Sequence, residues 1–159
     1  MKIVVFASGR GSNFKAIVEN IESGALTNVE VSLLLSNKPE ANVLAYAAEK
    51  GIPHVCVDEK QFASREAYEE AVLAEVKKVR CNLVVLAGYM KILGADFLAN
   101  VGCPVVNIHP SLLPSFPGLH AQKQAVDYGV KVSGCTVHFV DAELDHGPII
   151  AQVPVPVED

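Results

Sequence analysis

An amide and an imidazole stand two residues apart at the end of an apolar stretch, in a segment, Val105–Gly118, that reads Val-Val-Asn-Ile-His-Pro-Ser-Leu-Leu-Pro-Ser-Phe-Pro-Gly. We expect a buried strand that begins at Val105 to continue through His109 and to end at Pro110, because proline cannot extend a central ladder. Alternate residues of a strand share a face, so Asn107 and His109 point the same way, with Cα atoms roughly 6.6 Å apart. An amide donor beside a titratable imidazole can stabilise an oxyanion and handle a proton.

A plainer interpretation of this pair stays open. Asn and His at a strand end often only hydrogen-bond the backbone of the following loop, and an isolated Asn-x-His favours that interpretation. Prolines at Pro110, Pro114 and Pro117 favour the functional one, because they stiffen the loop where a site needs fixed walls.

A glycine-containing turn joins the first predicted strand to the first predicted helix. The strand Lys2–Ser8 ends at this turn, and apolar residues at helical spacing follow it as far as Gly24. Free backbone N–H groups and the helix dipole both face such a turn, which makes it a cradle for phosphate. We expect Gly11, Ser12 and Asn13 to hold a terminal monophosphate. A compatible alternative is that Ser12 or Asn13 only caps the helix.

Two common phosphate ligands do not fit this turn. No Gly-Lys-Ser/Thr follows the glycines, which excludes a P-loop. Phe14 stands where a dinucleotide fingerprint needs its third glycine, and the next strand, about Val29–Leu34, ends in Ser36-Asn37 without an acidic residue for a ribose hydroxyl. A nicotinamide cofactor is therefore disfavoured.

A cation at the start of a later helix is a second candidate for the same anion. Arg65 opens the predicted helix Arg65–Val79, where a positive charge opposes the helix dipole. It is either an ordinary solvated residue or a second contact to the phosphate.

Composition narrows the class of protein. The chain has 159 residues, 50% of them hydrophobic, a mean hydropathy of +0.29 and a formal net charge of -5, which suit one domain built on a sheet covered on both faces. No apolar run is long enough for a membrane span, and the acidic balance argues against nucleic acid and membrane surfaces as partners. Four dispersed cysteines suggest reduced, mostly buried thiols in a cytoplasmic protein.

Strands and helices alternate along the chain, which predicts an α/β fold with a doubly wound, mostly parallel, Rossmann-like sheet. The remaining predicted helices are Ala41–Lys50, Ile92–Leu98 and His120–Tyr128, and the remaining strands are His54–Val57, Leu83–Ala87, Gly134–Val140 and Ile149–Val155. The last two strands lie too close in sequence for a helical crossover, so we expect an antiparallel pair at the C-terminal end.

Ligands of such sheets bind outside the carboxyl ends of the strands, at the switch in strand order. We therefore expect Gly11–Asn13, Tyr89–Leu93 and Asn107–His109 around one cleft. With a right-handed, parallel crossover after His109, the loop Asp141–Pro148 also emerges beside that histidine.

With these stretches in place, the sequence resembles the glycinamide ribonucleotide formyltransferases, a folate-dependent family of purine synthesis, over essentially the whole chain. Gly11-Ser12-Asn13 is similar to the phosphate loop of that family. The run Asn107-Ile108-His109-Pro110-Ser111-Leu112-Leu113-Pro114 resembles the signature of the formyltransferase superfamily. Glu143-Leu144-Asp145-x-Gly147-Pro148 resembles the acidic folate loop.

The resemblance implies a role for each matching residue. It implies a catalytic trio in which Asn107 and His109 stabilise the oxyanion of a tetrahedral intermediate and Asp145 assists proton transfer. Residues implied for the ribonucleotide are Gly11, Ser12, Asn13, Arg65, Met90 and Ile108. Those implied for the cosubstrate, 10-formyltetrahydrofolate, are Lys91, Ile92, Leu93, Phe97, Leu98, Val140, Asp141, Ala142, Glu143 and Leu144. No metal is implied, because the histidines follow no metal-ligand spacing, and we expect His120, His138 and His146 to be folate-loop or core residues.

The resemblance also implies a single formyltransferase domain over residues 1–159, acting on small molecules as a monomer or homodimer, with a family C-terminal segment beyond the last strand that this sequence does not include. Two alternatives remain, whereas a methionyl-tRNA formyltransferase is disfavoured because it needs a basic tRNA-binding domain that we do not expect in this short acidic chain. A formyltetrahydrofolate hydrolase shares the trio but uses water as acceptor. A non-catalytic nucleotide-binding module would use the phosphate loop alone.

Overall fold

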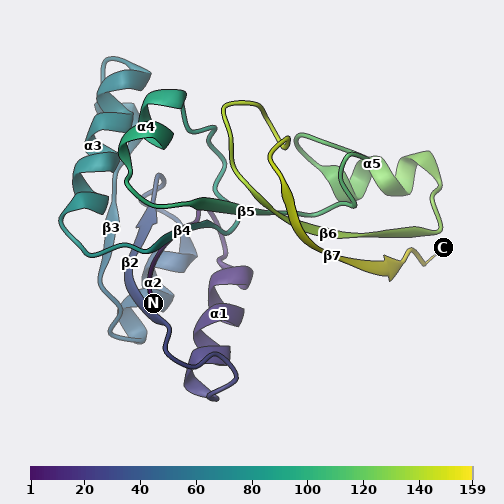
Figure 1. The fold of residues 1–159 in the computed structure, drawn as a ribbon, viewed down its shortest axis with the longest axis horizontal. Coiled ribbons are helices and arrows are strands. Elements are labelled where there is room, and N and C mark those ends of the chain that lie inside the picture. Colours follow the sequence, from purple (N-terminus) through teal and green to yellow (C-terminus); the bar gives the residue numbers. More distant parts are fainter. Residues whose placement is uncertain (159) are drawn as a thin grey trace. The chain divides into compact units, whose positions relative to one another are not determined.

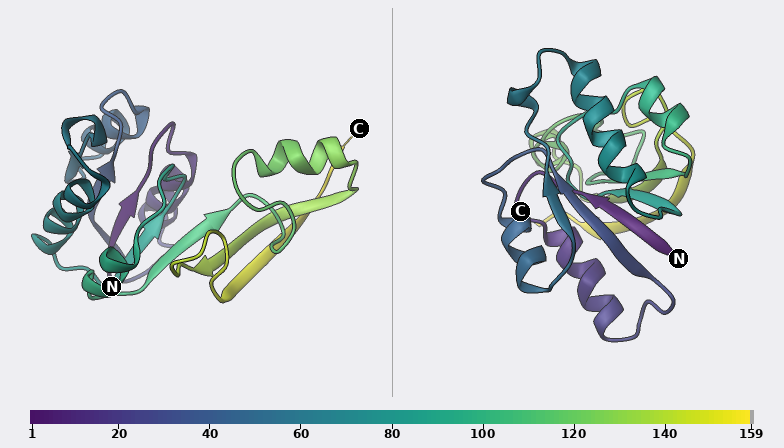
Figure 2. Two further views of the ribbon diagram at one scale, coloured as in Figure 1. Left: turned by 90° about the horizontal axis from the view of Figure 1, so that it is seen from above. Right: turned by 90° about the vertical axis from the view of Figure 1, so that its left-hand side faces the viewer.

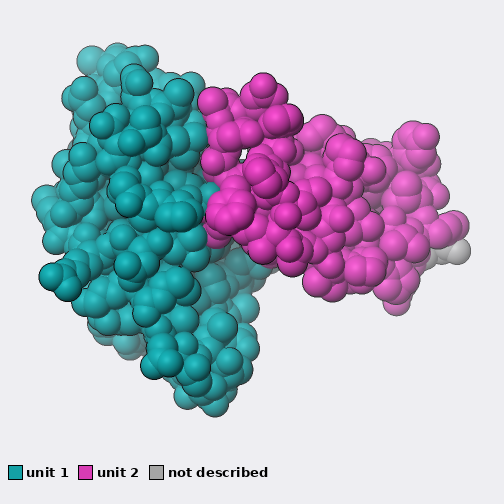
Figure 3. Space-filling view, viewed as in Figure 1, with its two compact units in different colours: residues 1–105 teal, residues 106–159 magenta. Residues whose placement is uncertain are grey.

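The computed structural model describes residues 1–158 of the chain, which divide into two compact units (Figures 1 and 3). The first unit is Met1–Val105 and the second begins at Val106. Among the described residues, no helix has both the length and the apolar character needed to cross a bilayer.

Strands and helices alternate through the first unit, as predicted. Its elements are β1 (Lys2–Phe6), α1 (Ser12–Glu22), β2 (Glu30–Ser36), α2 (Asn42–Glu49), β3 (His54–Cys56), the 3-10 turn η1 (Glu59–Gln61), α3 (Arg65–Lys77), β4 (Leu83–Leu86) and α4 (Ala95–Asn100). The elements that come after the first unit's helices and strands along the chain are β5 (Val105–His109), α5 (Ala121–Tyr128), β6 (Val132–Phe139) and β7 (Ile149–Pro156).

The four strands of the first unit are parallel and lie in the order β3-β2-β1-β4. Helices α1 and α2 cover one face of this sheet and α3 and α4 the other (Figure 2). Alternation along β1 explains the two layers: Ile3 and Val5 belong to the cluster with Phe14, whereas Phe6 packs edge-on against Tyr89 and Phe97 on the opposite face. The predicted doubly wound parallel arrangement is confirmed here.

Most predicted boundaries hold to within two residues, and α4 is the exception. The apolar pattern predicted a helix from Ile92, but α4 begins at Ala95. Residues 92–94 instead form a loop whose Gly94 N–H donates to both carboxylate oxygens of Glu69, each at 3.1 Å. The carboxylate of Glu69 therefore takes up the N–H of Gly94, and the helical turn expected at residues 92–94 does not form.

The second unit is an antiparallel arrangement in which β6 pairs with both β5 and β7. The antiparallel pairing of the last two strands is confirmed. The parallel crossover expected after His109 is wrong, because β6 runs antiparallel to β5. Helix α5 ends at Gly129, whose φ of 84° is left-handed, and β6 begins three residues later at Val132. This short connection reverses the chain instead of carrying it back to start a parallel strand.

Candidate active site

The predicted catalytic residues all lie in the second unit. His109, at the end of β5, is 4% exposed and uses both ring nitrogens. Its Nε2 lies 2.9 Å from the carbonyl oxygen of Phe116, and since a carbonyl can only accept, Nε2 carries the proton and donates it. Nδ1 is 3.5 Å from Oδ1 of Asp145. The backbone of the proline loop thereby fixes the ring so that its other nitrogen faces a carboxylate.

The carboxylate of Asp145 is almost as buried as the imidazole, with 8% and 6% of the two side chains exposed. Its second oxygen, Oδ2, accepts a hydrogen bond of 2.7 Å from the N–H of Gly118. Asp145 has a φ of 51°, a left-handed conformation that aspartate tolerates better than most residues. The expectation that this loop lies beside His109 is confirmed, although the strand leading to it runs in the opposite direction from the one predicted.

Asn107 lies opposite His138 in the register between β5 and β6. Nδ2 of the amide is 3.3 Å from Nε2 of His138, and Nδ1 of that imidazole is 2.9 Å from the carbonyl oxygen of Phe139. A proton on Nδ1 satisfies this carbonyl and leaves Nε2 to accept from the amide. One of the two Nδ2 hydrogens of Asn107 is then committed to His138, and the other stays available.

The proline loop is held in place by β6 and β7. Thr136 Oγ1 donates to the carbonyl of Ser111 at 2.7 Å and accepts from the N–H of Leu113 at 3.0 Å. Gln152 Nε2 donates to the carbonyl of Leu113 at 2.9 Å and to Thr136 Oγ1 at 3.0 Å. These bonds satisfy buried groups of the loop, so its carbonyl at Phe116 is a fixed acceptor for His109.

Three charged side chains of the acidic loop interact at its surface. His146 Nδ1 is 2.8 Å from Asp141 Oδ2, and its Nε2 is 3.7 Å from Glu143 Oε2. The hydrogen bond to Asp141 raises the pKa of His146, with a further contribution from the charge of Glu143. The same bond, together with the backbone N–H of Glu143, lowers the pKa of Asp141. Of the other residues predicted in this loop, Ala142 and Leu144 are exposed.

The predicted phosphate loop lies in the first unit. Gly11 is the N-cap of α1, with a left-handed φ of 76° and no side-chain capping bond, so the alternative in which Ser12 or Asn13 caps the helix is wrong. A Cβ at Gly11 would lie 2.4 Å from Cγ2 of Val43, so only glycine fits here. Ser12 and Asn13 are exposed, and neither side chain hydrogen-bonds another residue of the described range.

The loops after β1 and β4 lie side by side, as predicted for these two. The N–H of Ser8 donates to the carbonyl of Gly88 at 3.0 Å, and the N–H of Met90 donates to Ser8 Oγ at 2.8 Å. Ser8 Oγ in turn donates to Asn37 Oδ1 at 2.5 Å. The backbone of Met90 is thus fixed by side chains at the ends of β1 and β2.

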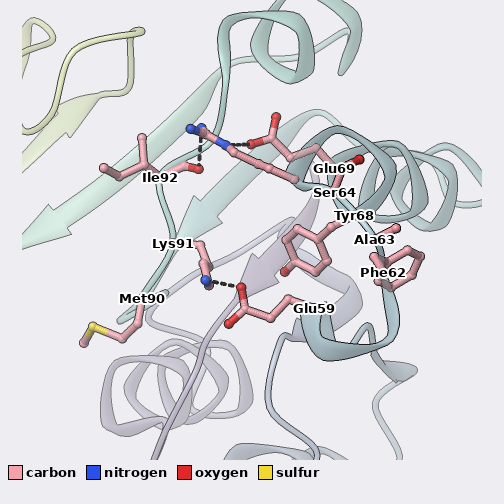
Figure 4. Close-up of a pocket in the computed structure, with 10 residues that line it drawn as sticks. Glu59, Phe62, Ala63, Ser64, Tyr68, Glu69, Met90, Lys91 and Ile92 are labelled. Carbon is pink, nitrogen blue, oxygen red and sulfur yellow. Dashed lines mark hydrogen bonds and ion pairs between the residues drawn. The ribbon is translucent and has the colours of Figure 1, made fainter.

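A cavity of about 550 Å³ in the first unit is lined by four of the predicted binding residues (Figure 4). These four are Arg65, Met90, Lys91 and Ile92. Arg65 donates through Nε to Glu69 at 2.7 Å and through Nη2 to the carbonyl of Ile92 at 3.0 Å. Lys91 forms an ion pair with Glu59. Arg65 is therefore tied to the 90–94 loop.

The remaining predicted residues differ in exposure. Met90 and Ile92 are more than half exposed, whereas Leu93 and Phe97 are each 2% exposed in the core of the first unit. Leu98, Ile108 and Val140 are half-buried. Within residues 1–158, no group of three or more His, Cys, Asp or Glu side chains could hold a metal ion.

Three contacts at these sites were not anticipated from the sequence. His138 was taken as a folate-loop or core residue, Glu69 was not singled out, and Phe116 acts through its carbonyl. Alternation along the strand predicted for 134–140 put Thr136 and His138 on one face, but His138 meets Asn107 only in the antiparallel register of β6 on β5, which this alternation does not reveal.

Comparison with known proteins gives matches over the whole chain. A family model described as formyl transferase matches residues 1–159. The trifunctional purine biosynthetic protein adenosine-3 of Drosophila melanogaster is 45% identical over 157 residues, which cover 98% of this chain and 12% of that much longer protein. The phosphoribosylglycinamide formyltransferase of Bacillus subtilis is 42% identical over 158 residues, 99% of this chain and 80% of its own length.

Solved structures agree with the sequence matches. The crystal structure of phosphoribosylglycinamide formyltransferase from Bacillus halodurans aligns with a TM-score of 0.94 at 45% identity, and covers 100% of this chain and 81% of that one. Glycinamide ribonucleotide transformylase 1 from Symbiobacterium toebii gives a TM-score of 0.95 at 41% identity and covers 100% and 74% of the two chains.

Proposed function

This chain belongs to the formyl transferase family, and on that premise we propose that it moves a formyl group from 10-formyltetrahydrofolate to the primary amine of glycinamide ribonucleotide. The observation that carries the proposal is the buried pair formed by His109, at the end of β5, and Asp145, in the loop between β6 and β7. A reaction of this kind needs a donor for the carbonyl oxygen and a carrier for the proton of the attacking amine.

Asn107 is our proposed donor to the oxyanion. Attack of the amine on the formyl carbon places negative charge on the formyl oxygen, and a preorganised N–H stabilises that charge. Support comes from the amide orientation, since His138 takes one Nδ2 hydrogen and leaves the second free. His109 is proposed as a second donor to the same oxygen, and because its Nε2 proton is engaged with Phe116, it would donate through Nδ1.

His109 and Asp145 form the proposed proton path. Nδ1 of the imidazole faces Asp145 Oδ1 at 3.5 Å, too far for a strong direct hydrogen bond, and we propose that the carboxylate also holds a water beside the imidazole. That water accepts the proton lost by the attacking amine and delivers one to the leaving nitrogen of the folate as the bond from this nitrogen to the formyl carbon breaks. Ser111 is not needed as a nucleophile, because its Oγ donates to the carbonyls of Ser115 and Phe116.

Binding of the two substrates falls to the other predicted residues. Gly11, Ser12 and Asn13 are proposed to hold the phosphate of the ribonucleotide, supported by the unpartnered side chains of Ser12 and Asn13 beside the free N–H groups that begin α1. Arg65 is proposed as a further contact to the ribonucleotide. The set proposed for the ribose and the folate is Met90, Ile108, Lys91, Ile92, Leu93, Phe97, Leu98, Val140, Asp141, Ala142, Glu143 and Leu144.

One assay tests the proposal. Purified protein is mixed with 10-formyltetrahydrofolate, and deformylated folate is followed with and without glycinamide ribonucleotide. Release that requires the ribonucleotide supports transfer, whereas equal release without it identifies a hydrolase. His109→Ala is expected to abolish transfer while the ribonucleotide still binds, and near-normal turnover by this variant would contradict the mechanism.

The non-catalytic alternative is separated by binding. A module that uses only the phosphate loop gives no response to a folate analogue in a fluorescence titration, whereas the transferase does. The predictions of a cytoplasmic protein that acts as a monomer or homodimer, without metal, nucleic acid or membrane, stay predictions.

A further inference from the structure

Two thiols meet at a place to which formyl transfer assigns no role. Cys81 precedes β4 and Cys103 precedes β5, both within the first unit, and their Sγ atoms lie 3.1 Å apart. Both side chains are half-buried rather than fully buried, contrary to the expectation for most of the cysteines, so a small reagent can reach them. The other two cysteines, Cys56 and Cys135, are free and have no such neighbour among the described residues.

Hydrogen bonds hold the backbone that follows each of the two thiols. Val84 N–H donates to the carbonyl of Pro104 at 3.0 Å, which joins the segment after Cys81 to the segment after Cys103. Asn82 is held in turn by β1: its N–H donates to the carbonyl of Lys2 at 2.8 Å, and its Oδ1 accepts from the N–H of Lys2 at 2.7 Å. A disulfide has an S–S length of about 2.05 Å, so the sulfurs need to approach by roughly 1 Å, within reach of side-chain rotation.

We propose that Cys81 and Cys103 form a reversible intramolecular disulfide when the protein meets a low-molecular-weight disulfide such as oxidised glutathione. One thiolate of the pair attacks a sulfur of the reagent, breaks its S–S bond and releases one thiol. The second thiol gives up its proton to solvent and attacks the mixed disulfide, which releases the second thiol. The protein loses two electrons and two protons, and the reagent gains both.

The two thiols are placed for an intramolecular second step. Burial, together with the neighbouring thiol of Cys81, raises the pKa of Cys103, which disfavours its thiolate and slows the reaction at neutral pH. A mixed disulfide on either cysteine places its sulfur beside the other thiol, so resolution is an intramolecular step.

The place of Cys81 and Cys103 in the fold determines how a disulfide between them affects the protein. It joins the segments that enter β4 and β5 at their amino ends, whereas the Gly11 loop and the Tyr89–Leu93 loop follow the carboxyl ends of β1 and β4. Cross-linking here closes a ring of about 20 residues in the unfolded chain, and this restriction favours the folded state. We expect oxidation to stabilise the first unit and to leave the substrate-binding loops in place.

Thiol counting and peptide mapping on the full-length chain test the proposal. The reduced protein has four titratable thiols, and after incubation with oxidised glutathione and removal of the reagent we expect two. Trypsin cleaves after Arg80, Lys91 and Lys123, so the disulfide links peptide 81–91 to peptide 92–123. We expect Tm to rise by roughly 5–10 °C on oxidation and to return when dithiothreitol is added.

Single serine variants separate this pair from the other cysteines. Cys81→Ser and Cys103→Ser are expected to lose the linked peptide and the shift in Tm, while the matched controls Cys56→Ser and Cys135→Ser keep both. Four titratable thiols in the wild-type protein after oxidation would overturn the proposal, as would a link that involves Cys56 or Cys135. None of these readouts depends on formyl transfer.

Discussion

Asp145 faces His109 with one carboxylate oxygen and the backbone of Gly118 with the other. The contact to the imidazole is 3.5 Å and the hydrogen bond from Gly118 is 2.7 Å, so the shorter contact fixes the loop and the longer one is directed at the ring. The buried side chain of Asp145 therefore makes one contact that holds the loop and one that faces the imidazole. A substitution can remove one of these contacts and keep the other.

Asp145→Asn keeps an oxygen that can accept from Gly118 but removes the charge opposite His109. Because asparagine also tolerates a left-handed φ, we expect the loop to keep its fold. The value of kcat is expected to fall by about 10²–10⁴, the usual contribution of a general acid or base, with little change in KM. Steady-state kinetics measure this, and a kcat near that of the wild type would show that the carboxylate takes no part in proton transfer.

Asn107→Ala removes the proposed donor to the oxyanion. We expect kcat to fall by about 10²–10³, since the N–H acts only on charge that develops in the transition state. Asn100→Ala is the matched control, because this exposed amide donates only to the carbonyl of Asp96 within its own helix. Comparable losses in the two variants would contradict the assignment of Asn107.

Gly11→Ala tests why the proposed phosphate loop needs glycine at this position. The residue combines a φ of 76° with a Cβ position 2.4 Å from Val43, whereas Gly24 has a φ of 77° and nothing within 4 Å. We expect Gly24→Ala to cost about 1–2 kcal/mol from backbone strain alone, and Gly11→Ala to cost about 1–3 kcal/mol more from overpacking. Urea denaturation measures both, and equal losses would show that Val43 moves aside without cost.

His146 gives the acidic loop a dependence on pH. Its pKa is raised from 6.5, so its ion pair stabilises the loop fully below pH 6.5 and is lost as the pH rises through the raised value. The pKa of Asp141 is lowered from 3.8, so the contribution is complete above pH 3.8 and is lost as the pH falls through the lowered value. The pair is therefore fully formed between these two limits.

An NMR titration of the imidazole measures this pair. In the wild type we expect the His146 midpoint above 6.5, and in Asp141→Asn a midpoint closer to 6.5. Glu143→Gln serves as the comparison and is expected to shift the midpoint less, because that carboxylate lies 3.7 Å away. An identical midpoint in wild type and Asp141→Asn is the result that contradicts this prediction.

Glu69 supports the 90–94 loop from α3. Its carboxylate accepts from Arg65 Nε and from the N–H of Gly94, and Glu69→Ala leaves that N–H without its acceptor. We expect KM for the folate to rise several-fold with kcat little changed, because the loop is proposed to bind and not to react. The exposed neighbour Glu70 provides the control, Glu70→Ala, for which unchanged kinetics are expected.

Much of the fold could be predicted from residues that lie close to one another in the sequence. Strand β5 begins and ends at the residues predicted, because an apolar run and Pro110 define both ends. Gly24 lies where the end of α1 was expected, with a left-handed φ of 77°. These features depend on the residues next to them in sequence.

Features that depend on distant residues were not predicted. The direction of β6 relative to β5 is set by the connection at Gly129, and an alternating strand pattern is the same in either direction. The late start of α4 depends on Glu69, which lies 25 residues before Gly94. For the site, the resemblance correctly brought His109 and Asp145 together, but no residue pattern indicates that a backbone carbonyl takes the Nε2 proton.

The bond from His109 to Phe116 ends on a main-chain oxygen, and this makes it unusually resistant to sequence change. Any side chain at position 116 leaves the carbonyl in place, so no substitution of Phe116 deletes the acceptor itself. The backbone path of the proline loop, and not the identity of a partner side chain, therefore sets which ring nitrogen of His109 carries the proton. Substitution at position 116 can therefore alter the surface of the protein while Nδ1 of His109 continues to face Asp145.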